Sequence, residues 1–135
     1  MTDMTTYLKN ALGEGTLGAS TYTAPTTVYL ALFTADPTDA GTQTAEIDDH
    51  ANYTSGYARQ ACAFDAFVAG ASANTAAETF GPIVTTGDIT ATHAAIMDAA
   101  TAGNMLYHDS LTASKVIQNG DSAEYAAGAL TVTLA

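Results

Sequence analysis

Basic residues are nearly absent from this sequence: its 135 residues include three Lys and Arg against fourteen Asp and Glu, a formal net charge of −11. Proteins that bind nucleic acid neutralise its phosphates with clustered Lys and Arg, and anionic membranes attract the same side chains. The three cations here, Lys9, Arg59 and Lys115, are scattered along the chain. We therefore expect neither nucleic acid nor a membrane as a partner, and we expect another protein instead.

Cysteine and long apolar runs are equally scarce. The lone Cys62 cannot form an internal disulfide, and no Cys and His spacing is typical of zinc, so we expect assembly in a reducing cytoplasm. No segment approaches the ~20 apolar residues of a membrane span. The N-terminus lacks a basic region followed by an apolar stretch, so we expect no signal peptide.

The residues that are present predict a single all-β domain. Residues 28–33 form an apolar run without alternation, typical of a strand buried on both faces, whereas residues 129–135 alternate apolar side chains with Thr, as in a half-buried strand. Further strands are expected at residues 57–68, 75–84, 89–98, 105–111 and 115–118. About seven short strands separated by turn residues favour a small antiparallel β-sandwich over residues 14–135. The core is expected to centre on Leu30, Leu32, Phe64, Phe80, Ile96, Leu106, Leu130 and Val132.

One short helix is expected at the N-terminus, over about residues 3–12. Five apolar residues recur there at helical spacing and form one stripe: Met4, Tyr7, Leu8, Ala11 and Leu12. Thr2 or Asp3 is suited to cap the start of the helix, and Gly13 is suited to end it. So short a helix is unstable alone, and its stripe must pack either on the β domain or on another subunit, with residues 1–13 as a docking arm. The stripe is therefore a candidate interface.

Acidic side chains gather before and within a polar loop at residues 42–56. Five of them offer the oxygen ligands that Ca²⁺ prefers: Asp36, Asp39, Glu46, Asp48 and Asp49. The spacing of an EF-hand is absent and acid-rich loops are usually solvated, so we expect no metal, although the sequence leaves open whether residues 46–50 bind Ca²⁺. His93 and His108 fall in strands that could pair, but no third metal ligand accompanies them.

Patterns typical of catalysis are missing as well. His108, Asp109 and Ser110 are the residue types of a hydrolase triad, but neighbours on a strand point to opposite faces and cannot converge. The chain has no Gly-x-Ser-x-Gly turn and no Gly-rich phosphate loop before a lysine. We therefore expect no enzyme activity, no catalytic residues and no cofactor.

Several segments resemble a known family. They are YLKNAL at 7–12, VYLALFTADPTDAG at 28–41, GYARQ at 56–60, DAATAGNMLYHDSLTASK at 98–115 and AAGALTVTL at 126–134. In this order they resemble short virion proteins of tailed bacteriophages and prophages, commonly labelled tail fibre-like or hypothetical structural proteins. The resemblance implies a structural protein of the virion, assembled in the host bacterial cytoplasm, with no catalytic residues. The loop before GYARQ is more acidic here than the Gly-rich stretch that the family often carries.

Three functional hypotheses follow. The favoured one is a capsid decoration (cement) protein that binds the outer shell and its major capsid protein, because the chain is compact, acidic and without the repeats or heptads of long fibres. The alternative is a tail or tail-fibre component involved in host contact. A small hydrolase or a carbohydrate-binding module has the least support, since the chain contains no Trp. Repeated contacts on a symmetric particle favour a homo-oligomer, and a trimer is preferred.

Overall fold

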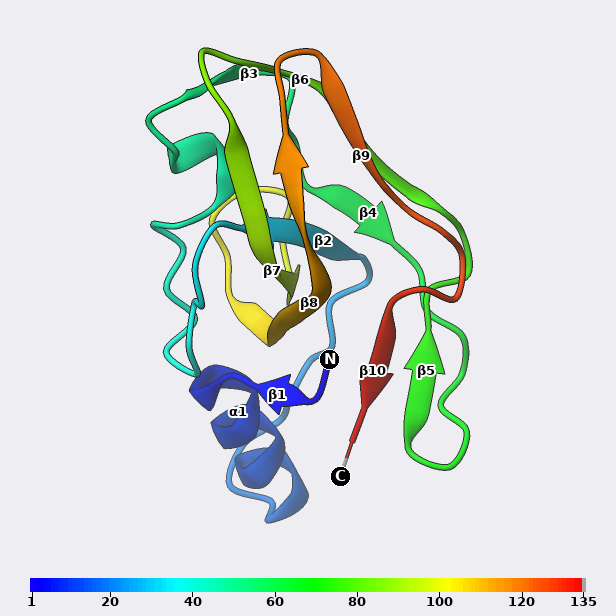
Figure 1. Cartoon of the computed structure of the whole chain (residues 1–135). Helices are drawn as coiled ribbons and strands as arrows, with labels where there is room; N and C mark the ends of the chain where they lie inside the picture. Colours follow the sequence, from blue (N-terminus) through cyan, green and yellow to red (C-terminus); the bar gives the residue numbers. More distant parts are fainter. Residues whose placement is uncertain (135) are drawn as a thin grey trace.

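The computed structural model describes residues 1–134, which form one α-helix, one 3-10 turn and ten strands (Figure 1). In chain order the elements are β1 (Asp3–Met4), α1 (Thr6–Thr16), β2 (Val28–Phe33), the turn η1 (Ile47–Asp49), β3 (Tyr53–Ser55), β4 (Gln60–Cys62), β5 (Ala71–Ala73), β6 (Glu78–Thr85), β7 (Ile89–Met97), β8 (Met105–Ile117), β9 (Asp121–Tyr125) and β10 (Thr131–Thr133). This confirms the all-β class with one short N-terminal helix. Neither helical element of the described residues has the length and apolar character to cross a bilayer.

The strands form three antiparallel sheets. The largest has the order β1-β8-β7-β2-β4, a second has the order β3-β6-β9, and β10 pairs with β5 in a separate two-stranded sheet. The main core lies between the first two sheets, because buried residues of β2, β7 and β8 pack with those of β6 and β9 in one cluster. The strand number exceeds the expected seven because β1, β3, β4, β5 and β10 have only two or three residues each.

Strand β2 is covered on both faces, as its unbroken apolar run predicts. Leu30 and Leu32 point into the main core, where Phe80 from β6 lies in the same cluster. Ala31 and Phe33 point to the other face and join a smaller buried cluster with Met97. The last four side chains of β2, from Leu30 to Phe33, are fully buried. The prediction for this strand is confirmed.

The predicted core is buried with one exception. Seven of the eight residues are at most 7% exposed: Leu30, Leu32, Phe80, Ile96, Leu106, Leu130 and Val132. Phe64 is only partly buried against the main core. It lies beyond the end of β4, where a single bridge to Asn74 replaces the continuous strand expected over residues 57–68. The prediction of one long strand there is wrong, since only Gln60–Cys62 is extended and paired with β2.

Helix α1 begins and ends later than expected. The side chain of Thr5, and not of Thr2 or Asp3, caps its start by accepting a hydrogen bond from the backbone of the first turn. Asp3 is unavailable as a cap because it belongs to β1 and pairs with β8. Gly13 lies inside the helix, and the left-handed glycine that follows its end is Gly18, with φ of 73°. Tertiary pairing of β1 therefore sets the start of the helix.

Strand β8 joins two predicted strands through a wide bulge. The ladder with β7 pairs Lys115 with Ala91 and Ser110 with His93, so residues 111–114 stand opposite the single residue Thr92. The break expected between residues 111 and 115 is therefore present as a bulge within one strand. The expected separation into two strands is wrong, because the ladder resumes in the same direction after the bulge.

Short strands with polar sequences escaped prediction. Strand β9 contains one buried residue, Ala123, among exposed or half-buried neighbours, so its pattern resembles a loop. It is extended because it pairs with β6 at the edge of the three-stranded sheet. Strand β6, which lies within the expected strand at 75–84 and ends one residue beyond it, changes register with β9 between Phe80 and Ile83, where Gly81 and Pro82 lie.

Replacing Leu32 tests the double-sided burial of β2. Leu32→Ala should lower the free energy of unfolding by about 2–5 kcal/mol, because it leaves a cavity in a fully packed core. Val116→Ala, at a side chain that is 51% exposed on β8, is the matched control and should cost less than about 1 kcal/mol. Urea denaturation followed by circular dichroism measures both. Equal losses of unfolding free energy in the two variants would show that Leu32 contributes no more to packing than an exposed side chain does.

Candidate functional site

A buried ion pair joins the GYARQ segment to the acidic loop. The guanidinium of Arg59 donates to both carboxylate oxygens of Glu46, at 2.8 Å from Nε and 2.7 Å from Nη2. The two side chains are only 5% and 6% exposed. Arg59 also donates from Nη1 to the carbonyls of Ala99 and Ala102, and from Nη2 to the side chain of Gln43. All five N–H groups of the guanidinium are therefore used within the chain.

Tyr57 extends this network into the sheet. Its hydroxyl donates to Glu46 at 2.8 Å and accepts from the backbone N–H of Leu32 at 3.0 Å. Its ring stacks on Phe80, with centroids 5.5 Å apart and planes within 6°. Burial, followed by the neighbouring Glu46 carboxylate, raises the pKa of Tyr57 well above its ordinary value. The hydrogen bonds that Arg59 donates to Glu46 likewise raise the pKa of Arg59, so both groups keep one protonation state at any physiological pH.

This network fixes the positions of the loops that it joins. A catalytic or anion-binding arginine needs free donors that face a cavity, and Arg59 has none. Glu46, which was predicted as a possible Ca²⁺ ligand, is the partner of Arg59. Sequence reasoning missed the pair, although a single Arg within a largely uncharged segment signals an acidic partner, since Arg is almost never buried unpaired.

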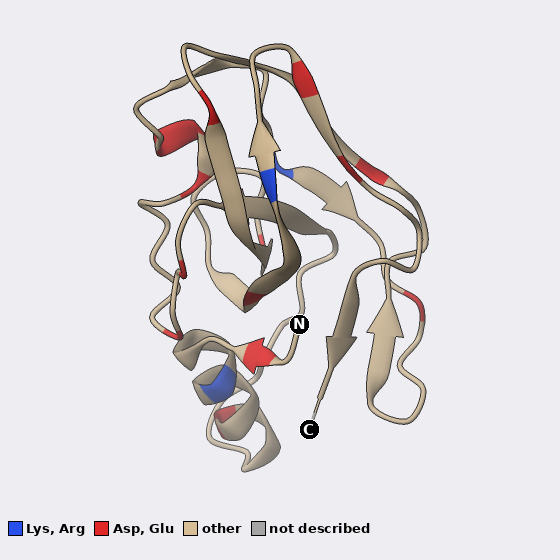
Figure 2. Cartoon of the chain, viewed as in Figure 1, with Lys and Arg blue, Asp and Glu red and all other residues tan. Residues whose placement is uncertain are grey.

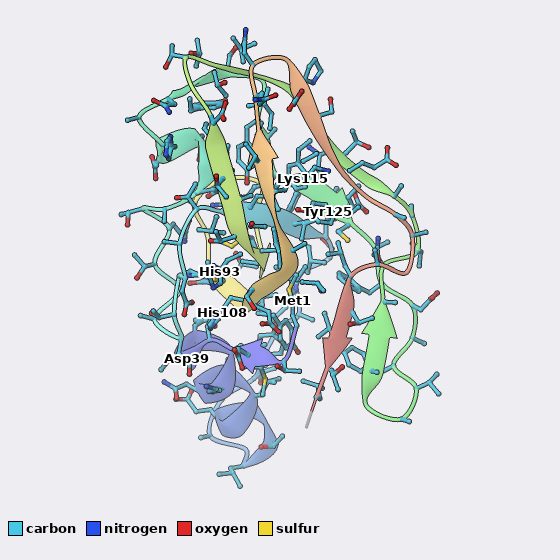
Figure 3. The ribbon with its side chains drawn as sticks, in the orientation of Figure 1. Met1, Asp39, His93, His108, Lys115 and Tyr125 are labelled. Atoms are coloured by element: carbon cyan, nitrogen blue, oxygen red, sulfur yellow. The ribbon has the colours of Figure 1, made fainter. Side chains whose placement is uncertain are left out.

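A second polar cluster joins β8 to the loop after β2. His108 is buried and lies between two carboxylates, with Nε2 at 3.1 Å from Asp39 and Nδ1 at 3.5 Å from Asp36 (Figure 3). Lys9 from α1 also binds Asp39. The hydrogen bond from Lys9, and then that from His108, lowers the pKa of Asp39. The cluster thus ties the helix, the loop and the sheet together.

The other predicted metal and catalytic residues do not converge. His93 and His108 lie on the same face of paired strands but are offset, because they pair with Ser110 and Ala95. His93 contacts the neighbouring Thr92 hydroxyl instead. Within the described residues, no group of three or more His, Cys, Asp or Glu side chains is placed to hold a metal ion.

The remaining acidic and triad residues lie apart. Asp48 and Asp49 form the 3-10 turn η1 on the surface of the acidic loop. Burial, then repulsion from Glu46, raises the pKa of Asp48. Ser110 is exposed while His108 is buried, and Asp109 bonds the backbone N–H of Ser110. The Ser110 hydroxyl contacts Asp109 at 3.5 Å, whereas His108 contacts Asp36 and Asp39.

The five residues of the predicted interface divide between the core and the surface. Leu8 is 2% exposed and belongs to the main core, and Met4 and Leu12 pack against it. Ala11 is half-buried, while Tyr7 is 44% exposed. The helix is thus anchored on the β domain. Whether residues 1–13 also act as an arm that reaches another subunit stays a prediction.

All three basic side chains have partners within the chain. Arg59 binds Glu46 and Lys9 binds Asp39. The ammonium group of Lys115 lies 5.8 Å from the centre of the Tyr125 ring, in a cation–π arrangement. Acidic side chains are spread over the fold, whereas β2, β3, β4, β5, β7 and β10 contain no Asp, Glu, Lys or Arg (Figure 2). The surface is that of an acidic protein without a basic patch.

These features define a small, acidic β-domain whose ionisable side chains stabilise its loops. The chain belongs to the family described as Podophage GP4 fiber I protein gp80, whose model matches residues 3–133. It is therefore a virion structural protein of a tailed phage, as the resemblance found in the sequence implies. No curated protein matches the chain.

Removing one member of the buried ion pair should be strongly destabilising. Glu46→Gln should lower the free energy of unfolding by about 3–5 kcal/mol, because Arg59 then remains charged in a buried position. Glu124→Gln on the exposed face of β9 neutralises a carboxylate without burying a charge, and it should cost less than about 1 kcal/mol. Chemical denaturation compares the two. Similar losses would mean that solvent compensates for the missing partner.

The lone thiol provides a separate test of packing. Cys62 is 4% exposed, and burial raises its pKa to about 12, with Glu78 as a further cause. The reactive thiolate is then negligible at neutral pH, so iodoacetamide should leave the native protein unmodified. The same reagent should alkylate the protein fully in denaturant, as mass spectrometry would show. Rapid labelling of the native state would contradict the burial of β4.

Proposed function

We propose that the protein is a non-catalytic subunit of a podophage tail fibre and that α1 contributes the surface that attaches it to neighbouring virion proteins. The match to the fibre family over residues 3–133 carries this proposal. It favours the fibre alternative over the capsid decoration that compactness and acidity had suggested. A non-catalytic role has support from the polar side chains, since Arg59, Glu46, His108 and Asp39 all bind one another within the fold.

The exposed side of α1 is suited to attachment. Tyr7 is 44% exposed, and Leu17, which follows the last turn, is 86% exposed. Leu8 on the inner side is buried in the main core, so the helix is held in place while these two side chains face solvent. Exposed aromatic and aliphatic side chains on a rigid element are typical of contact surfaces. A homotrimer remains the preferred arrangement of such subunits.

Labelling of intact virions tests the location. Gold-conjugated antibody against the protein should mark the tail or its fibres in electron micrographs. Label distributed over the shell would instead support the decoration hypothesis. Copy number from quantitative mass spectrometry of purified virions provides an independent measure, because a shell protein is present in far more copies than a fibre protein.

Polar replacements on α1 should weaken incorporation without unfolding the domain. Tyr7→Ser combined with Leu17→Ser removes two exposed apolar contacts, and the amount of protein in purified virions should fall by about tenfold or more. Val84→Ser is the control, because Val84 is 41% exposed on β6 and lies outside the helix. It should leave incorporation unchanged. Unchanged incorporation of the helix variant would exclude α1 as the attachment surface.

A further inference from the structure

Two long stretches of the chain carry almost no charge. No charged residue lies between Glu14 and Asp36, and Asp65 is the single one between Arg59 and Glu78. The structure uses these stretches to build two exposed apolar features on the β domain. These features are a hairpin tip and a groove. A second acidic protein that binds at either of them meets little charge repulsion.

The first feature, the hairpin tip, is formed by Phe67 and Val68, which are 48% and 74% exposed. Val68 and Ala71 exchange two backbone hydrogen bonds, at 2.9 and 3.1 Å. The two residues between them, Ala69 and Gly70, have φ of 51° and 80°, as in a tight two-residue hairpin turn. The tip is therefore well ordered, and it presents two large apolar side chains where turns normally carry polar ones.

The second feature, the β4 groove, is a cleft of about 420 Å³ beside strand β4. It is lined by residues 25–28, which lead into β2, and by residues 61–64 of β4 and its extension. None of these residues is charged, and Phe64 lies half-buried in its wall. β4 is the last strand of the five-stranded sheet, so the groove lies at an open sheet edge (Figure 1).

We propose that the hairpin tip of one copy of this chain inserts into the β4 groove of a second copy. Phe67 and Val68 stay exposed in the single chain, so its own tip does not fill its groove. Two copies that each carry a net charge of −11 repel one another least where acidic residues are few, and Asp65 is the single charged residue in the two stretches that form the tip and the groove. Insertion would also bring Phe67 of one copy to Phe64 of the other, a favourable aromatic contact.

This contact joins two different surfaces, so it is heterologous. Each copy keeps one free tip or one free groove after a single contact forms, and copies therefore add head to tail. The assembly closes into a ring if the rotation between copies allows it, and otherwise it extends. This inference concerns the isolated protein and does not depend on where the protein lies in the virion.

Sedimentation of the purified full-length chain tests the proposal with two complementary variants. Phe67→Ser with Val68→Ser removes the tip, and Ala61→Glu places a carboxylate at an exposed position in the groove. Wild type should associate with increasing concentration, and each variant should weaken that association by about tenfold or more. Higher salt should strengthen wild-type association, because it screens repulsion between acidic copies while leaving the apolar contact intact.

Mixing the variants gives the decisive observation. Each variant alone should be monomeric, but their mixture retains one intact tip and one intact groove and should form a dimer that does not grow further. Val84→Ser, outside both features, should associate as wild type does, and melting curves establish that every variant is folded. A monomeric wild type at all concentrations, a mixture that stays monomeric, or a groove variant that associates normally would each overturn the proposal. None of these results would affect the fibre assignment, which the location of the protein in virions tests.

Discussion

The buried pair of Arg59 and Glu46 is the constraint on which the arrangement of the loops depends. The long segments between β2 and β4 contain little regular structure, and so does the connection between β7 and β8. Arg59 binds both regions. It contacts Glu46 and Gln43 in the loop after β2, and it contacts the carbonyls of Ala99 and Ala102 between β7 and β8. Taking both charges out of water is costly, and five well-placed hydrogen bonds are what offset that cost. The pair therefore selects one loop arrangement more than it adds net stability.

The small number of basic residues also limits the kinds of contact that the protein can make with its partners. Each of the three basic residues has a partner inside the chain, so the surface offers little positive charge to phosphate-rich ligands. Glu46 and Asp39 hold the fold together through their ion pairs, and the exposed acids repel other copies of the chain. Association must then rely on apolar contacts in regions with little charge, and those regions include the exposed Leu17 after α1, the hairpin tip and the β4 groove.

Local sequence patterns predicted the parts of this fold that local interactions decide. The unbroken apolar run predicted β2 with its bounds, and the alternation around Val132 predicted a strand at 129–135, of which Thr131–Thr133 is a strand and residue 135 lies outside the described residues. The start of α1 was misplaced because it depends on the pairing of Asp3 with β8, which no local pattern reveals. Strand β9 was missed for the same reason. Glu46 was interpreted as a possible Ca²⁺ ligand because its partner lies thirteen residues away, in a loop whose position only the whole fold defines.

The family match favours a fibre, whereas the absence of internal repeats first favoured a capsid location through a weak inference. It assumed that the length of a fibre must come from a repeated pattern within one chain, such as heptads. An elongated structure can equally arise from compact domains that bind one another through two different surfaces, because heterologous contacts propagate where isologous ones close. Each domain then needs only a rigid projection and a matching groove, and many weak apolar contacts along the assembly act together. A short acidic β-domain without repeats or heptads is compatible with such a fibre, and its surfaces of low charge become the part of the sequence that specifies assembly.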